Sequence, residues 1–318
     1  MTAPTSGAVS APGAVPVIWN SNAGQKVRGP LAPTSTEDLE RALSDAGVTA
    51  RIVRTDSEDD AKQAVAQAVG AGEKLIVAAG GDGTFGLVGT QLLGTDVALG
   101  ILPLGSVMNI ARMLGVPRDV GAAAKVIAAR REAQIDVAEA NGQVFFESAS
   151  VGIQAAVFRH ASEWEKGDLR SVVRAVRDAF RFLPARIEMT LDGDRHVAAR
   201  ALMVTISNAP YVGVGMTVAP DARLDDGQLD VRVFEHFSKA ELFRHLASIA
   251  FGRRQYSPRV STYRCATVKV LGHRPLPVRA DARDLGTTPL ECRVRASELR
   301  VIVGPDYADG RAPIAGGD

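Results

Sequence analysis

The sequence predicts two domains: an α/β N-terminal domain built on a parallel sheet with helices on both faces, and a second domain that is a mostly antiparallel β-sandwich. Short apolar runs alternate with amphipathic stretches up to about residue 131, and strands separated by polar turns follow. In addition, 318 residues with 46% hydrophobic content exceed the usual size of one domain. We therefore expect domains over residues 15–131 and 132–305, with flexible tails at 1–14 and 306–318.

Four strand–helix pairs follow one another in the first domain. Short apolar runs predict the strands, and stretches with apolar residues at helical spacing predict the helices. Such a succession is typical of a parallel sheet, because each helix returns the chain to the same edge. The strands are expected at 15–19, 49–53, 75–79 and 97–102, and the helices at 36–46, 58–69, 84–93, 106–114 and 119–130.

Beyond residue 131, two dipeptides predict tight hairpin turns. Asn141-Gly142 and Asp192-Gly193 each stand between two apolar segments, and both dipeptides readily adopt the positive φ angles of a two-residue turn. The strands are expected at 135–140, 143–148, 187–191, 197–206, 229–234, 267–271, 276–280 and 299–303, and two helices near 169–182 and 238–251.

Composition excludes several classes of protein. Lysine and arginine (37) nearly balance aspartate and glutamate (36), so the net charge of +1 gives no general attraction to nucleic acid. The two cysteines, Cys265 and Cys292, are too few for a disulfide framework and lack metal-binding spacing, which favours a cytoplasmic location. No run of about 18 apolar residues is present, so membrane contact is expected only at the surface of the inner membrane face.

The strongest chemical signal is a glycine-rich turn after the third expected strand, Gly80-Gly81-Asp82-Gly83-Thr84. Ligands of open α/β sheets bind beyond the carboxyl ends of the strands. Glycines there leave backbone N–H groups uncovered, and the positive end of the following helix attracts phosphate. Asp82 fits such a site if it holds a magnesium ion or orients the phosphate through one. Thr84 is expected to cap the helix.

Other interpretations of this turn were weighed. A strand-to-helix turn with a capping threonine and no ligand would explain the same residues. A Walker-type loop is excluded because no Lys-Ser or Lys-Thr follows the glycines. The segment from Gly81 to Gly86 fits the letters of the dinucleotide fingerprint, but it follows the third strand and lacks an acidic ribose-binding residue at the usual distance.

With its neighbouring motifs, the turn resembles the catalytic domain of the diacylglycerol kinase family, which sphingosine and ceramide kinases share and to which NAD kinases are more distantly related. The similarity covers most of residues 15–305 and depends on the order and spacing of the motifs. In the first domain these are Asn20-Ser21-Asn22-Ala23-Gly24, Thr55 with Asp60-Ala61, the glycine turn, Pro103-Leu104-Gly105-Ser106 and Ala111-Arg112 with Leu114-Gly115 and Pro117. In the second domain they are Phe145-Phe146-Glu147 with Gly152, then Asn208, Gly213, Gly215-Met216 and 219–230.

The resemblance implies a kinase that uses ATP and Mg²⁺ to phosphorylate the hydroxyl of a diacylglycerol-like or sphingoid lipid, held in a cleft between the domains. Ser106 would stand at the start of another helix, facing the phosphates. Asn109 is included because Met108 occupies the position of the family's usual polar residue. The implied nucleotide-binding residues are Asn20, Thr55, Gly80, Gly81, Asp82, Gly83, Thr84, Gly105, Ser106 and Asn109, and Asp82 is also assigned a catalytic role.

The resemblance also implies a structural magnesium ion at Asp226, with backbone carbonyl groups of Arg223 and Gln228 as further ligands. Asp226-Gly227 is also a common turn dipeptide, so a turn without metal explains the same residues.

The sequence departs from the family where the base toward the lipid hydroxyl is expected. Family members usually carry Asp-Gly-Glu before the last strands, whereas this chain reads Asp281-Ala282-Arg283-Asp284. Arg283 cannot accept a proton, so Asp281 and Asp284 are both candidate bases. Phosphoryl transfer depends mainly on positioning and electrostatics, and a base contributes about 10²–10⁴-fold, so activity can persist without the usual acid.

Two alternatives stay open. One is a nucleotide- or lipid-binding protein that has lost catalysis, favoured by Arg283 and Met108. The other is an NAD kinase, which would carry an Asn-Glu dipeptide that this chain lacks. The expected partner is a lipid alcohol. The apolar face of the helix near 238–251 is expected to pack in the core, and the alternative is peripheral membrane contact in which its end, with Arg253, Arg254 and Tyr256, meets anionic lipid headgroups. A homodimer is compatible with the sequence, which identifies neither the lipid nor a regulator.

Overall fold

The computed structural model describes residues 13–20, 35–158, 174, 177, 181–213, 215–235, 237–238, 240–242, 244 and 260–308. The chain forms two compact units, one from residues 1–133 and 300–305 and the other from residues 134–299 and 306–318. Most of the two helices expected near 169–182 and 238–251 lies outside the described residues. None of the described helices is both long enough and apolar enough to cross a bilayer.

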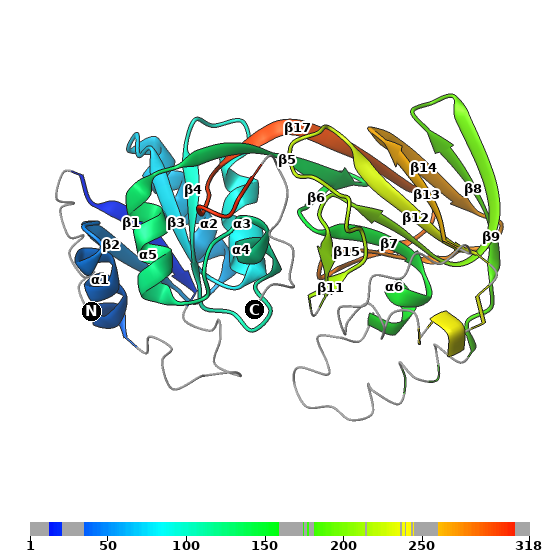
Figure 1. Cartoon of the computed structure of the whole chain (residues 1–318), viewed down its shortest axis with the longest axis horizontal. Coiled ribbons are helices and arrows are strands. Elements are labelled where there is room, and N and C mark those ends of the chain that lie inside the picture. The colour runs from blue at the N-terminus through cyan, green and yellow to red at the C-terminus, as the bar shows by residue number, and fades with distance from the viewer. Residues whose placement is uncertain are drawn as a thin grey trace, which may run out of the picture. The chain divides into compact units, whose positions relative to one another are not determined.

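The first unit contains a parallel sheet, as predicted (Figure 1). Its strands lie in the order β4-β3-β1-β2. They are β1 (Val15–Asn20), β2 (Ala50–Thr55), β3 (Leu75–Gly80) and β4 (Ala98–Pro103), and the helices are α1 (Thr36–Asp45), α2 (Glu58–Gly70), α3 (Asp82–Leu92), α4 (Asn109–Met113) and α5 (Val120–Ala129).

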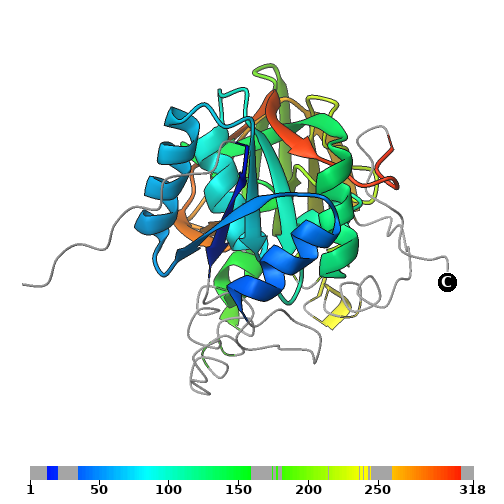
Figure 2. The ribbon, with the colours of Figure 1, turned by 90° about the vertical axis from the view of Figure 1, so that its left-hand side faces the viewer.

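Helices cover both faces of this sheet, because every residue of the central strands β3 and β4 is apolar, glycine or proline and is buried. The helices α1 and α5 pack on each other, as do α2 and α3, and Figure 2 shows the strands lying between these two layers. Serine side chains fix where two helices begin. Ser35 caps α1, and Ser57 forms a capping box with Asp60 at the start of α2.

The end of the last strand, β17 (Leu290–Ile302), returns to the first unit and extends its sheet. Val301 pairs with Leu99 of β4 in parallel. The segment that follows is anchored at Gly304, whose N–H donates to Leu114 O at 2.8 Å and whose carbonyl accepts from Arg131 Nη1 at 3.2 Å. The sequence placed residues 299–303 in the sandwich, and this was wrong for the end of the strand.

The second unit is a sandwich whose strand pairs with assigned register are all antiparallel. Strands pair in the order β16-β15-β7-β9-β8-β14-β17, β12 joins β9 to β13, and β5 pairs with β17 and β6. The elements are β5 (Glu132–Ala140), β6 (Gln143–Phe145), β7 (Ser148–Gly152), α6 (Ile153–Phe158), β8 (Ala185–Leu191), β9 (Arg195–Ser207), β10 (Tyr211–Val212), β11 (Met216–Thr217), β12 (Leu229–Glu235), β13 (Val260–Cys265), β14 (Thr267–Gly272), β15 (Pro277–Ala280), β16 (Arg283–Thr287) and β17.

Both predicted hairpins are confirmed. Asn141 and Gly142 have φ of 47° and 79° and lie between the paired residues Ala140 and Gln143, as a two-residue turn requires. Asp192 and Gly193 also have positive φ, of 51° and 84°, but Leu191 pairs with Arg195, so this loop contains Asp194 as a third residue. The carboxylate of Asp192 also accepts the N–H groups of Ala266 and Thr267, at 2.8 and 2.9 Å, so this turn is fastened to the adjacent strand.

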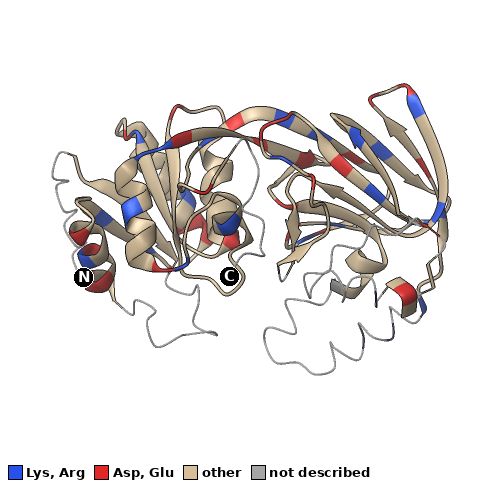
Figure 3. Ribbon diagram, viewed as in Figure 1, with Lys and Arg blue, Asp and Glu red and all other residues tan. Residues whose placement is uncertain are grey.

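The core of the second unit lies between strands with alternating apolar residues, and Phe145, Ile206, Val231 and Val270 are among its fully buried members. Charged residues of both signs are interspersed along β14 and β17 (Figure 3). Lys269 of β14 and Glu291 of β17 form an ion pair at 2.6 Å. Exposed pairs of this kind contribute little stability, so the apolar face holds the strands together.

Candidate active site

The glycine turn lies where the sequence predicted, between β3 and α3. The helix begins at Asp82, with Gly81 as its N-cap and no side-chain cap. The N–H groups of Thr84 and Phe85 donate to Gly81 O, at 3.0 and 3.1 Å. Within the described part of the chain, the N–H groups of Gly81, Asp82 and Gly83 donate no hydrogen bond. Three amides at the positive end of α3 are thus available to an anion.

Thr84 does not cap the helix, so that prediction was wrong. It is the third residue of α3, and its side chain is buried in the space that a Cβ atom on Gly80 would fill. Gly80 is therefore required by packing, independently of any ligand.

A second glycine loop, at Gly105 after β4, lies directly against the first. An ideal Cβ on Gly105 would stand 2.6 Å from Gly81 Cα and 2.8 Å from Met108 Sδ. The sulfur accepts the Gly105 N–H at 3.1 Å. Since β3 and β4 are parallel neighbours, the two loops form one continuous surface of backbone at the carboxyl edge of the sheet.

Ser106 lies in this loop and is exposed, but it does not begin a helix. The helix α4 starts three residues later, at Asn109, after Met108 with φ of 61°. Arg118 holds the loop from outside, donating from Nη2 to Ser106 O at 2.8 Å. Arg118 was not predicted as a site residue, because no motif distinguishes it from other surface arginines.

The carboxylate of Asp82 caps the start of α4. Its Oδ2 accepts the N–H of Asn109 at 3.1 Å, and its Oδ1 accepts the N–H of Ile110 at 2.9 Å. Burial raises the pKa of Asp82, while these backbone N–H groups and Arg118 act in the opposite direction. The carboxylate therefore ties the glycine turn to the start of α4, a role that the sequence did not indicate.

The other predicted nucleotide residues gather at the same edge of the sheet. Asn20 and Thr55 are the last residues of β1 and β2 and are partners in the register of the two strands. Thr55 is buried and donates from Oγ1 to Trp19 O at 3.3 Å, and Asn109 is buried at the start of α4. Residues 21–34, with the rest of the first motif, lie outside the described residues.

In the second unit, Asp281 is engaged by the backbone. Its Oδ2 accepts the N–H of Phe146 at 2.8 Å, and its Oδ1 accepts those of Glu147 at 3.0 Å and Ser148 at 3.1 Å. Phe146 and Glu147 lie between two short strands, β6 and β7, so the prediction of a single strand over 143–148 was wrong.

Asp284 differs from Asp281 in its surroundings. It is exposed on β16, a short strand without a buried residue, and its Oδ1 accepts the N–H of Gly286 at 2.8 Å. The neighbouring Arg283 is exposed as well. Of the two candidate bases, Asp284 is thus the more accessible.

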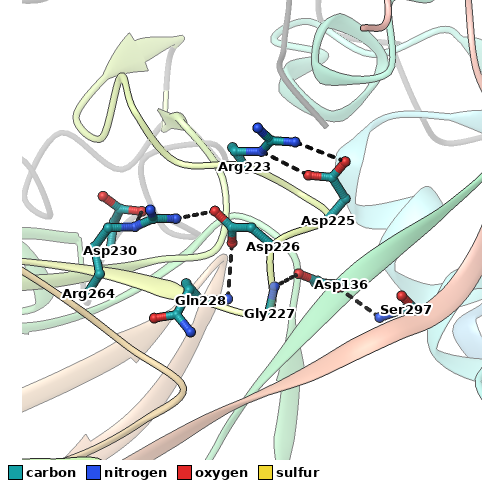
Figure 4. Close-up of polar contacts among 9 residues, drawn as sticks. All are labelled: Asp136, Arg223, Asp225, Asp226, Gly227, Gln228, Asp230, Arg264 and Ser297. Carbon is teal, nitrogen blue, oxygen red and sulfur yellow. Dashed lines mark hydrogen bonds and ion pairs between the residues drawn. The ribbon is translucent and has the colours of Figure 1, made fainter. Parts of the chain in front are cut away.

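Of the groups proposed as ligands of a structural metal, the carboxylate of Asp226 already has protein partners for both oxygens (Figure 4). Asp226 Oδ1 accepts the N–H of Gln228 at 3.0 Å, and Asp226 Oδ2 is paired with Arg264. The guanidinium of Arg223 binds Asp225, with Nε to Oδ1 at 3.0 Å. Among the described residues, no three His, Cys, Asp or Glu side chains are grouped so that they could hold a metal.

Two further aspartates surround this turn, and both are buried. Asp136 Oδ2 accepts the Gly227 N–H at 2.6 Å, and Asp136 Oδ1 accepts the Ser297 N–H at 2.8 Å. Asp230 Oδ2 lies 3.7 Å from Arg264 Nε, and burial raises the pKa of Asp230 to about 6 although Arg264 and Arg232 favour its charged form. No local pattern indicates Asp136, because its partners Gly227 and Ser297 are far away in the chain.

Comparisons with known proteins agree with this arrangement. Residues 14–140 match the family described as diacylglycerol kinase catalytic domain, and residues 147–303 match the YegS C-terminal NAD kinase beta sandwich-like domain. The chain is 30% identical over 219 residues to a protein of Mycobacterium tuberculosis named diacylglycerol kinase, covering 66% of this chain and 71% of that protein. A Klebsiella pneumoniae protein named "Probable lipid kinase YegS-like" is 31% identical over 198 residues, covering 60% and 66% of the two chains.

The fold is also known from a crystal structure of a diacylglycerol kinase from Bacillus anthracis. The two folds superpose with a TM-score of 0.72 at 21% sequence identity, over 93% of this chain and 98% of that one. At this identity, the similarity shows the shared fold alone.

Proposed function

Because the chain belongs to the diacylglycerol kinase catalytic-domain family, we propose that it transfers the γ-phosphoryl group of ATP, bound with Mg²⁺, to the hydroxyl of a diacylglycerol-like or sphingoid lipid. The proposal is supported by the N–H groups of Gly81, Asp82 and Gly83, which donate no hydrogen bond to any described residue. They stand at a helix start and at the carboxyl edge of a parallel sheet, where phosphate groups bind.

The chain's own residues provide positioning and electrostatic stabilisation, which dominate phosphoryl transfer. The amides of the glycine turn would hold the phosphate oxygens, and the absence of side chains at Gly81 and Gly83 lets the phosphates approach. Asp82 fixes the turn against the Gly105 loop through its bonds to Asn109 and Ile110. A magnesium ion bound with ATP would neutralise the charge that develops on the transferred group.

For the base, we propose Asp284 rather than Asp281. The carboxylate of Asp281 accepts three backbone N–H groups and thereby anchors the 146–148 segment, so both of its oxygens are already engaged. Asp284 is exposed on β16, where a lipid hydroxyl can reach its carboxylate.

The experiment is a transfer assay with radiolabelled ATP, magnesium and a panel of diacylglycerols, ceramides and other lipid alcohols. We expect a labelled product that partitions into organic solvent. Asp82→Asn should reduce turnover strongly, whereas Asp119→Asn, which alters the N-cap of α5 in the same unit, should leave turnover unchanged. ATP binding without transfer to any lipid would instead support the binding protein that has lost catalysis.

A further inference from the structure

The turn that joins β11 to β12 carries several negative charges in a small volume. Asp225 and Asp226 lie in the turn, Asp230 follows in β12, and Asp136 of β5 reaches it from the side (Figure 4). Asp136 and Asp230 are each 1% exposed. Carboxylates this close destabilise one another unless cations lie among them.

Arg264 supplies a positive charge inside this group. It lies on β13, directly opposite Asp230 in the register of β12 and β13. Its Nη2 is paired with Asp226 Oδ2, and its Nε lies 3.7 Å from Asp230 Oδ2. One guanidinium therefore lies close to two carboxylates, one in the turn and one in β12, as a bound divalent ion would.

The conformation of the turn directs Asp226 toward Arg264. Gly227 has φ of 64°, and its N–H is held by the buried carboxylate of Asp136. The next N–H, of Gln228, is held by Asp226 itself at 3.0 Å. These two hydrogen bonds fix the backbone on either side of the turn, and Asp226 Oδ2 points toward the Arg264 guanidinium.

We propose that Arg264 takes the place of a divalent cation at this turn, so that the second unit keeps its fold without a bound metal. The proposal concerns the stability of this unit and does not rest on the proposed kinase activity. Replacing Arg264 by a neutral residue leaves the paired carboxylates of Asp226 and Asp230 without their shared cation and creates a need for an external one.

The test is thermal unfolding of the nucleotide-free protein, with EDTA and with millimolar MgCl₂ or CaCl₂. Leaving nucleotide out removes magnesium that ATP would bring to the other unit. We expect wild type to unfold at the same temperature in all three solutions. Arg264→Gln should unfold about 3–6 °C lower in EDTA, because it leaves the buried carboxylate of Asp230 without the guanidinium that faces it, and divalent ions should restore most of this loss.

Two variants serve as controls. Arg264→Lys keeps the charge and should lose less stability than Arg264→Gln, without a response to divalent ions. Arg223→Gln removes an arginine of the same turn that pairs with Asp225 and not with Asp226, so it too should not respond. These controls separate a role for the Arg264 charge from a general effect on the turn.

Three results would each overturn the proposal: an EDTA-induced fall in the unfolding temperature of wild type, an Arg264→Gln protein as stable as wild type in EDTA, or an Arg264→Gln protein that divalent ions fail to stabilise. The first needs no variant, so the proposal is testable even if Arg264→Gln fails to fold. Calorimetric titration of wild type with CaCl₂, which should show no binding at this unit, gives an independent measurement.

Discussion

Gly105→Ala should disrupt the contact between the two glycine loops. The new methyl group would stand 2.6 Å from Gly81 Cα, about 0.8 Å inside the 3.4 Å at which ordinary contact begins. It would also meet Met108 Sδ at 2.8 Å. The sulfur belongs to a flexible side chain, but Gly81 is backbone, so the loops themselves must separate.

Overpacking of this kind costs about 1–3 kcal/mol. For a chain of this size, the unfolding temperature should fall by about 2–10 °C. The amides of Gly81 and Gly83 would move with the loop. If they bind phosphate, the loss of one charge-assisted hydrogen bond should raise the Kd for ATP about tenfold or more.

Thermal unfolding and calorimetric titration with ATP measure these two effects, and Gly83→Ala is the matched control. Gly83 is exposed, has no atom within 4 Å of an added Cβ, and is the second residue of α3. Alanine favours a helix by up to about 1 kcal/mol over glycine, so this variant should be as stable as wild type or more so. It should nevertheless bind ATP more weakly, since a methyl group beside the amides hinders the phosphates. Wild-type affinity in both variants would refute the assignment of the turn as a phosphate site.

Two further predictions concern carboxylates of the second unit. The pKa of Asp230 is raised from 3.8 to about 6, so the contribution of its protonation to stability is fully present below the unfolded pKa and is lost as pH rises through 6. In urea unfolding, the free energy of unfolding of wild type should therefore fall by up to about 3 kcal/mol relative to that of Asp230→Asn between about pH 4 and pH 7. A difference between the two proteins that does not change with pH would contradict this prediction. Asp281→Asn should lower the unfolding temperature because three N–H groups lose a charged acceptor. Asp284→Asn should leave the unfolding temperature unchanged and reduce lipid phosphorylation by about 10²-fold or more. Equal turnover of Asp284→Asn and wild type would exclude Asp284 as the base.

The sequence predicted the first unit well because its elements are determined locally. Each strand is a short apolar run, each helix has a repeat of about 3.6 residues, and serines at positions 35 and 57 mark helix starts. The hairpins at Asn141-Gly142 and Asp192-Gly193 were predictable for the same reason, since few residues other than glycine and asparagine or aspartate tolerate φ near +50° to +80°.

The sandwich was predicted less completely. The strand β17 was not predicted over its full length, although Leu290, Cys292 and Val294 alternate with charged residues as in a half-buried strand. The strand β16 has no such signal. None of its residues is buried, so it exists through its pairing with the preceding strand β15 and has no apolar alternation from which the strand could be inferred.

The aspartates of the candidate sites show why assigning chemistry from sequence is harder than assigning a fold. Asp82, Asp226 and Asp281 each match a motif, yet each accepts backbone N–H groups in the structure. A short carboxylate with four lone pairs suits a helix start or an open turn as well as it suits a metal or a phosphate. The partners of Asp82 and Asp281 lie 27 or more residues away, so no local pattern reveals them.

It follows that losing activity on replacing such an aspartate does not by itself assign a chemical step. The same substitution removes an anchor of the loop that presents the site, so stability and turnover change together. A role in chemistry is indicated only when turnover falls much further than the unfolding temperature and ATP affinity account for. Asp82→Asn, which keeps one oxygen as a hydrogen-bond acceptor, allows this separation, because the amide retains part of the cap and loses the negative charge.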